Sequence, residues 1–179
     1  RSRPSQPSEI SSCACTVRSS RANPFLALSL SRETRASGSI HIGGQLVSAW
    51  SYAGWSSKDS LEGVLALAEP ITAFADGEAV VLNQDEVSGK VVLIKRGETS
   101  FYEKARAAQR VGAVGVLIAN NDEQNPNAVH EMAGGGEDEI HVPVVMVSHS
   151  EGERAIELGA GTPVAIAGLD VEIDTQWVK

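Results

Sequence analysis

Two short apolar runs in this sequence are separated by a stretch with a helical apolar stripe. Residues 90–95 (KVVLIK) and 113–120 (AVGVLIAN) are short and rich in branched apolar side chains, which is typical of strands covered on both faces. Between them, apolar side chains recur at helical spacing, at Phe101, Ala105, Ala108 and Val111. This order predicts a βαβ unit, in which the two strands run parallel and the crossover is right-handed.

Two serines are expected to begin helices. Ser100 is followed three residues later by Glu103, and Ser148 is followed by Glu151. This is the pattern of a capping box, in which each side chain satisfies a free backbone N–H of the other residue. The second box predicts a helix over residues 149–160. Both serines are therefore explained as helix caps.

Five further segments have the apolar pattern and flanking turn residues of strands. They are residues 63–70, 78–82, 140–148, 162–167 and 169–173. With the βαβ unit they give a mixed α/β fold of about seven strands and two helices. Aromatic residues make up only 4% of the chain, so the core must consist of Val, Ile, Leu and Ala.

The N-terminal segment differs in composition from the rest. Its first forty residues contain eleven Ser and six Arg but only two acids, so they cannot bury enough apolar surface to order themselves. We expect residues 1–43 to be a disordered arm or a targeting segment. The Arg- and Ser-rich composition is typical of an organelle transit peptide, and residues 24–30 (PFLALSL) would be a short secretory core. The domain is expected over residues 44–175, with a tail at 176–179.

Charge and cysteine content limit the classes of partner. After residue 40 the chain has nine basic and 21 acidic residues, which disfavours nucleic acid and anionic membranes. No apolar run approaches the roughly 18 residues of a membrane span. The only cysteines are Cys13 and Cys15, so the predicted domain has neither a disulfide nor a Cys-based zinc site, and a reducing compartment fits this usage.

Phosphate and dinucleotide motifs are incomplete. The turn after residue 95 has a single glycine, Gly97, and it places Glu98 where a phosphate would bind. Gly112 and Gly115 lie on the wrong side of their strand for a dinucleotide fingerprint.

Hydrolase motifs are incomplete as well. Neither Ser100 nor Ser148 lies in a G-x-S-x-G elbow. His130 and Glu131 begin an H-E-x-x-H zinc motif, but Gly134 occupies the position of the second histidine. We therefore expect no enzymatic activity and no cofactor in this chain.

The long acidic connection over residues 121–139 is the best candidate for a binding surface. Long connections in compact domains are usually functional or disordered. Ligands tend to meet the C-terminal ends of parallel strands, so the connection should act together with the turn at 96–98. The candidate residues are Arg96, Glu98, Asn120, Asn121, Asp122, Val129, His130, Glu131 and Met132. Val129 and Met132 are expected to be apolar anchors, and a basic protein or peptide segment would be the natural partner.

An alternative uses the same connection for a different purpose. Carboxylate and imidazole groups within residues 121–141 would suit a hard or borderline cation, in a small-ligand or metal-binding α/β protein. The residues concerned are His130, Glu131, Asp138, Glu139 and His141. A solvated acidic loop without a ligand is the simpler reading.

An ordered series of short motifs resembles the protease-associated (PA) domain family. It comprises a Gly-Lys strand ending in Arg-Gly, a Phe-x-x-Lys-Ala helix, a Gly-Ala-x-Gly strand ending in Asn, and a Pro-Val-Val strand ending in Ser. In this chain these are residues 89–90, 96–97, 101–105, 112–115, 120–121 and 143–148. The resemblance covers about residues 60–167. Many family members carry a disulfide-bonded Cys where Thr99 stands here.

The resemblance implies a module without catalytic residues. PA domains occur within or beside subtilisin-like and zinc peptidases, in sorting receptors and beside membrane-anchored ubiquitin-ligase domains. They are thought to bind protein or peptide, or to cover a neighbouring active site. The resemblance also implies that the protein is located in the endomembrane or secretory system. The transit-like composition of the N-terminal segment leaves an organelle as the alternative location.

Overall fold

The computed structural model describes the backbone of residues 29–178 and the side chains of residues 37–169. Two units are distinguished, Ala36–Asp170 and the pair of segments Arg1–Arg35 and Val171–Lys179. The first unit, here called the body, contains residues 44–170 of the predicted domain 44–175. Within the described residues no helix is long and apolar enough to cross a membrane.

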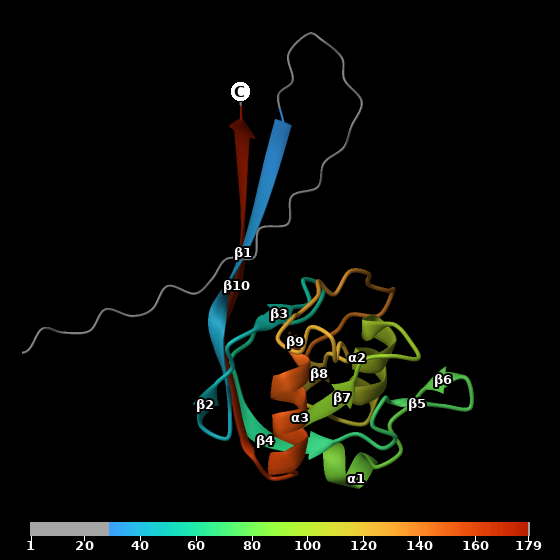
Figure 1. Cartoon of the computed structure of the whole chain (residues 1–179). Coiled ribbons are helices and arrows are strands. Elements are labelled where there is room, and N and C mark those ends of the chain that lie inside the picture. The colour runs from blue at the N-terminus through green and yellow to red at the C-terminus, as the bar shows by residue number, and fades with distance from the viewer. Residues whose placement is uncertain (1–28, 179) are drawn as a thin grey trace, which may run out of the picture. The chain divides into compact units, whose positions relative to one another are not determined.

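Eight strands form one sheet in the order β2-β1-β10-β4-β7-β8-β9-β3 (Figure 1). Their bounds are β1 (Ser29–Ile42), β2 (Gln45–Leu46), β3 (Trp50–Tyr52), β4 (Leu61–Leu67), β7 (Val91–Lys95), β8 (Gly115–Ala119), β9 (Val144–Val147) and β10 (Pro163–Val178). The central strands β4, β7, β8 and β9 run parallel, and antiparallel strands flank them on both sides. The expected mixed α/β fold with a parallel βαβ core is confirmed.

Two of the three helices cover opposite faces of the parallel strands (Figure 1). Helix α2 (Phe101–Arg110) packs Ala105 and Ala108 into one hydrophobic cluster with the β8 side chains of Val116 and Ile118. Helix α3 (His149–Leu158) lies against the other face of β8. A Cβ at Gly152 would come within 2.4 Å of the Ala119 Cβ, so glycine permits this close approach. The third helix, α1 (Gln84–Val87), is a single turn beside β4.

Both predicted helix starts are confirmed. The Ser100 hydroxyl accepts a hydrogen bond from the Glu103 amide at 3.2 Å, and the Ser148 hydroxyl accepts one from the Glu151 amide at 3.3 Å. Each glutamate carboxylate pairs with the arginine one turn later in its own helix, at 2.6 Å. The serine half of each capping box is therefore formed, while the carboxylates contribute through ion pairs along the helix.

Three strand predictions differ from the structure. The expected strand at 78–82 shrinks to β6 (Glu78–Ala79), which pairs only with β5 (Phe74–Ala75). Residues 140–148 form a strand only in β9, because Pro143 offers no amide to a sheet. The two expected C-terminal strands are one strand, β10, which continues to Val178 within the expected tail 176–179.

The expected boundary at residue 43 also differs. β1 begins at Ser29, and its residues Ile40 and Ile42 are fully buried in the body. The end of the expected arm therefore contributes to the core. Residues 1–28, to which the arm and targeting predictions chiefly apply, lie outside the described part of the chain.

Candidate functional site

The first part of the candidate site lies where β7 and β8 end side by side. The two strands pair in parallel up to Lys95 and Ala119. The next residue, Arg96, donates its amide to the Ala119 carbonyl at 2.9 Å, and its Nη1 donates to Oδ1 of Asn120 at 3.0 Å. The Arg96 guanidinium also lies 6.0 Å from the centre of the Phe101 ring, within the range of a cation–π contact. The expected meeting of these two strand ends is thus present.

Asn120 is a buried structural link. It is 2% exposed, and its Nδ2 donates to the Ala128 carbonyl at 2.9 Å. Its Oδ1 accepts from both Arg96 and the Asn121 amide, and its carbonyl oxygen lies 3.3 Å from Nδ1 of His149. The side chain therefore closes the loop that follows β8, and it has little capacity left for a ligand.

The turn after β7 is built from unusual backbone angles. Gly97 and Glu98 have φ values of 122° and 66°, and the Thr99 amide donates to the Gly97 carbonyl at 2.8 Å. This geometry turns the Glu98 side chain out to solvent, where it is exposed. Left-handed φ is uncommon outside glycine and often occurs where a site constrains the backbone.

A residue that the sequence analysis missed lies under this turn. Lys104 on α2 is fully buried, and its Nζ donates to the Thr72 carbonyl. Burial lowers the Lys104 pKa to about 8, while the negative charge of Glu98 opposes that shift. Lys104 lies three residues after Phe101, on the apolar stripe of the helix, and that spacing was the available signal.

The connection after β8 is anchored to the body at its first turn. The Asp122 carboxylate accepts hydrogen bonds from the Asn125 amide at 3.0 Å and from the Asn125 Nδ2 at 3.2 Å, and these bonds lower the Asp122 pKa. The Ser150 amide, in the first turn of α3, donates to the Pro126 carbonyl at 2.9 Å. The loop thus has a defined shape even though Asn121 and most of its neighbours are exposed.

Of the two expected apolar anchors, Met132 is part of the core and the half-buried Val129 packs against it. Met132 is 4% exposed, and Val129 packs against the α2-side cluster. The Met132 carbonyl accepts from Trp55 Nε1 at 3.0 Å, which fixes the backbone at the same point. The Met132 side chain thus packs into the core instead of facing a partner, and the Val129 side chain does so in part. The side chains of His130 and Glu131, which lie between them, are exposed.

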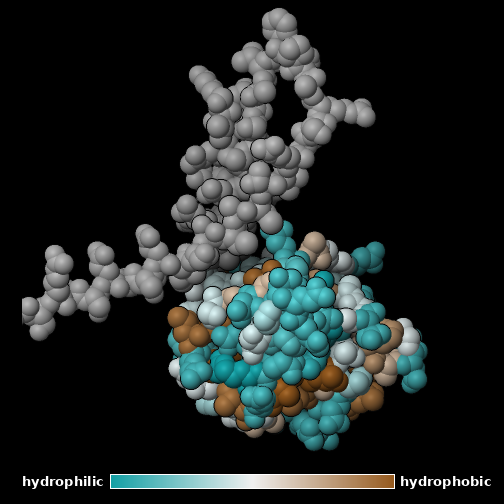
Figure 2. Space-filling view, viewed as in Figure 1, coloured by the Kyte–Doolittle hydropathy of each residue, from teal (hydrophilic) through white to brown (hydrophobic). Residues whose placement is uncertain are grey.

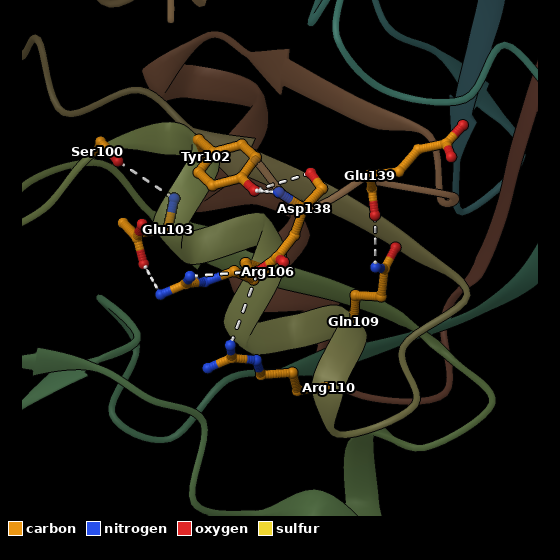
Figure 3. Close-up of polar contacts among 8 residues, drawn as sticks. All are labelled: Ser100, Tyr102, Glu103, Arg106, Gln109, Arg110, Asp138 and Glu139. Carbon is orange, nitrogen blue, oxygen red and sulfur yellow. Dashed lines mark hydrogen bonds and ion pairs between the residues drawn. The ribbon is translucent and has the colours of Figure 1, made fainter. Parts of the chain in front are cut away.

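The later part of the connection is clasped to α2 (Figure 3). The Tyr102 hydroxyl donates to the Asp138 carbonyl and accepts from the Asp138 amide, both at 2.8 Å. The Asp138 carboxylate lies 3.3 Å from Nη1 of Arg106 and 3.8 Å from Nη2 of Arg110. We call these contacts the α2 clasp. They leave the Asp138 carboxylate paired within the chain.

The clasp continues one turn further along α2. The Gln109 side chain donates to the Glu139 carbonyl at 3.0 Å and accepts from the His141 amide at 2.7 Å. Gly136 is required beside it, because a Cβ there would come within 2.2 Å of the Tyr102 ring. The clasp therefore depends on a glycine as well as on polar partners.

The metal alternative is not supported by this arrangement. His130 and Glu131 lie at the Trp55 end of the connection, while Asp138 belongs to the α2 clasp. The Nδ1 of His141 and Oε1 of Glu139 approach only to 4.0 Å at the surface. Among the residues described, no three or more His, Cys, Asp or Glu side chains gather as a metal site.

We call the solvent-accessible candidate residues, together with the adjoining Glu123, the strand-end surface. Arg96 and Asp122 are half-buried, and the other members are exposed, namely Glu98, Asn121, Glu123, His130 and Glu131. A cavity of about 240 Å³ elsewhere on the body is lined by His41, Gly44, Glu62, Gly63 and residues 163–165, and none of the candidate residues lines it. The face of the body shown in Figure 2 is largely hydrophilic, with hydrophobic residues gathered in its lower half.

The sequence of this chain is similar to segments of larger known proteins. The chain is 31% identical over 101 residues to the ER degradation-enhancing alpha-mannosidase-like protein 3 of Xenopus laevis. The aligned segment covers 54% of this chain and 11% of that protein. It is 35% identical over 68 residues to aminopeptidase YwaD of Bacillus subtilis, covering 38% of this chain and 14% of that protein. This chain thus corresponds to a small part of each relative.

The fold has a solved counterpart. A zinc aminopeptidase from Bacillus subtilis aligns with 83% of this chain and with 35% of its own length, at a TM-score of 0.57 and 22% identity. A family model described as the PA domain matches residues 43–155. That match includes β7, α2, β8, the acidic connection and most of α3, and the chain belongs to the PA domain family.

Proposed function

We propose that this chain is a non-catalytic module of a larger protein and that it binds a protein or peptide segment. One observation carries the proposal. Similar segments occur in a protein named as mannosidase-like and in one named as an aminopeptidase, at 11% and 14% of their lengths. Cleaving a glycoside and cleaving a peptide need different catalytic groups. A segment common to both is better explained by binding than by either reaction.

The strand-end surface is the part of the body best suited to this role. Its backbone is fixed by Asn120 below, by Ser150 on α3 and by the buried Met132. A surface that is already ordered loses less conformational entropy on binding. Exposed side chains on an ordered frame are what recognition of a polypeptide requires.

The charge of this surface favours a basic partner. Asp122, Glu123 and Glu131 are not ion-paired within the described residues, and Arg96 is turned toward Asn120. Complementary charge speeds association and excludes acidic competitors. A footprint of this size buries less than about 1,200 Å², which is the range of weak, transient complexes.

Peptide display would test the binding proposal. The full chain would select from a library of random decapeptides, and we expect enrichment of sequences that contain Lys and Arg. The double variant Glu123→Lys/Glu131→Lys should bind the selected peptides at least about tenfold more weakly, since close opposite charges contribute on the order of 1.5 kcal/mol or more.

A matched control has the same change in net charge. Glu69 and Glu157 are exposed and belong to neither the strand-end surface nor the α2 clasp, so Glu69→Lys/Glu157→Lys should retain wild-type affinity. Equal loss in both double variants would point to net charge alone, and failure to enrich any peptide would contradict the proposal.

The non-catalytic part has its own test. The chain should give no turnover of a broad peptide and ester substrate library. Turnover that disappears in Ser100→Ala or Ser148→Ala, with both variants shown to be folded by circular dichroism, would contradict it.

A further inference from the structure

The last strand of the sheet leaves half of its backbone groups facing outward. β3 pairs with β9 in antiparallel register, Ser51 opposite Met146. The carbonyls of Pro143, just before β9, and of Val147, at its end, accept hydrogen bonds from the β8 side, at 2.9 and 3.0 Å. Alternation along a strand therefore points the backbone of Met146 toward β3.

The same alternation assigns the two sides of β3. The Ala53 amide donates to the Val144 carbonyl at 3.0 Å, so Ser51 and Ala53 use their backbone groups inside the sheet. The N–H and C=O groups of Trp50 and Tyr52 then point away from β9. Across the described residues, no hydrogen bond reaches these outward groups.

β3 also lacks the features that usually protect a sheet edge. Exposed edges are normally blunted by Lys, Pro or a bulge, because their unpaired groups invite another strand. The sequence of β3 is Trp-Ser-Tyr, without charge or proline. Its length of three residues limits an added strand to four backbone hydrogen bonds, two at Trp50 and two at Tyr52.

The acidic connection runs beside this edge. Ser51 Oγ donates to the His130 carbonyl at 2.6 Å, and Trp55 Nε1 donates to the Met132 carbonyl at 3.0 Å. Glu131 lies between these two attachments, and its side chain is exposed. The open edge and part of the strand-end surface are therefore adjacent.

We propose that the β3 edge binds an extended basic peptide segment as an added strand, hydrogen-bonded to the outward groups of Trp50 and Tyr52, with a Lys or Arg side chain facing Glu131. Main-chain hydrogen bonds provide the attraction in this mode of recognition, and side-chain contacts provide the selectivity. The inference rests on the proposed function and adds how the partner is held. The half-buried ring of Trp50 supplies an apolar contact of the kind enriched at binding hot spots.

A basic peptide fits the edge better than a second copy of this chain. Pairing two copies of β3 about a two-fold axis would bring the two Glu131 carboxylates toward the same interface, where like charges repel. A Lys- or Arg-bearing strand instead places opposite charges together.

Amide hydrogen exchange followed by NMR tests the proposal directly. The probe is an octapeptide of alternating Lys and Val, which favours an extended conformation. In the free chain the amides of Trp50 and Tyr52 should exchange quickly, while those of Ser51 and Ala53 are protected. With the peptide, exchange at Trp50 and Tyr52 should slow at least about tenfold, in line with one new hydrogen bond each.

Three results would overturn the proposal. One is unchanged exchange at Trp50 and Tyr52 while the peptide shifts resonances at Glu131, which would leave the proposed function intact and place the peptide elsewhere. Another is no binding of the peptide at millimolar concentration. The third is slower exchange at these amides as the concentration of the chain alone rises, which would make the occupant a second copy.

A pair of variants separates the backbone group from the side chain. Trp50→Pro and Trp50→Ala both remove the indole, but only proline removes the outward N–H. Proline is tolerated at the first residue of an edge strand whose N–H faces solvent. We expect Trp50→Pro to bind the peptide about fivefold more weakly than Trp50→Ala, the effect of one net hydrogen bond. Equal affinities in two folded variants would contradict strand addition.

Discussion

The two ends of the acidic connection both carry several acidic residues but are held by the body in different ways. Around residues 121–131 the backbone is tied to the body, while acidic side chains such as Glu123 and Glu131 remain exposed. Around residues 136–141 the Asp138 carboxylate faces Arg106 and Arg110 in the α2 clasp. The density of acidic residues therefore does not locate a binding surface. We expect the surface where exposed carboxylates lie beside the strand ends and the β3 edge, and not along the α2 clasp.

The largest predicted effect concerns how the first end is held. Met132→Ala should lower the free energy of unfolding by about 3 kcal/mol, because it removes a buried side chain and leaves a cavity. Replacing the neighbouring exposed residue, Glu131→Ala, should lower the free energy of unfolding by less than about 0.5 kcal/mol, as is usual at the surface. Urea denaturation of both variants measures the difference. Similar small losses would mean that Met132 does not anchor the loop.

A second prediction uses the pH dependence of Lys104, which lies under the turn at 96–98. Its pKa falls from 10.5 in the unfolded chain to about 8 in the folded one, so the unfolded chain binds more protons between these values. Stability should therefore rise as the pH increases from 8 to 10.5, by up to about 3 kcal/mol for this group.

The comparison for that prediction is Lys104→Met, which keeps the volume and removes the charge. Thermal melts at pH 7 and pH 10 should show a gain for wild type relative to this variant. An equal pH response in both proteins would show that Lys104 is not the titrating group.

A third prediction concerns the second end of the connection. Gly136→Ala should destabilise the fold by about 2 kcal/mol, since its Cβ collides with the Tyr102 ring and the core has little room to yield. Gly54 has open space around its Cβ position and no positive φ, so Gly54→Ala is the matched control and should be nearly neutral. Calorimetric melting temperatures of the two variants provide the measurement. Equal values would show that the close packing of Gly136 on the Tyr102 ring does not stabilise the clasp.

The smallest predicted effect is loss of the clasp hydroxyl. Tyr102→Phe keeps the ring and removes two hydrogen bonds to Asp138, so it should cost about 1 to 2 kcal/mol. Amides of residues 137–139 should exchange faster, whereas those of residues 122–128 should not change. Faster exchange at both ends would show that the two ends open as one unit.

Much of the fold could be predicted because its central elements carry strong local signals. The strands β7 and β8 are continuous apolar runs, and the helices α2 and α3 each begin at a serine cap. The short strands β2 and β3 could not be predicted, since two or three residues have no measurable periodicity. Their strand geometry comes from pairing with distant partners.

The candidate site was predictable in position but less so in detail. The meeting of Arg96 and Asn120 follows from parallel strands that end together. The burial of Met132 could not be foreseen, because one apolar residue in a polar connection is compatible with either a core contact or a surface anchor. Asn120 is predicted to bind because it ends a parallel strand, but its side chain instead makes hydrogen bonds within the loop that it closes.

Charge reversal at the two ends of the connection tests whether the partner binds at the strand-end surface. The variants Glu123→Lys/Glu131→Lys and Glu137→Lys/Glu139→Lys have the same net charge and alter four exposed side chains of one connection. Titration of both with the selected basic peptides should show at least about a tenfold loss of affinity for the first pair and less than about threefold for the second. Equal losses would contradict binding at the strand-end surface, because the peptide would then respond to the charge of the whole connection.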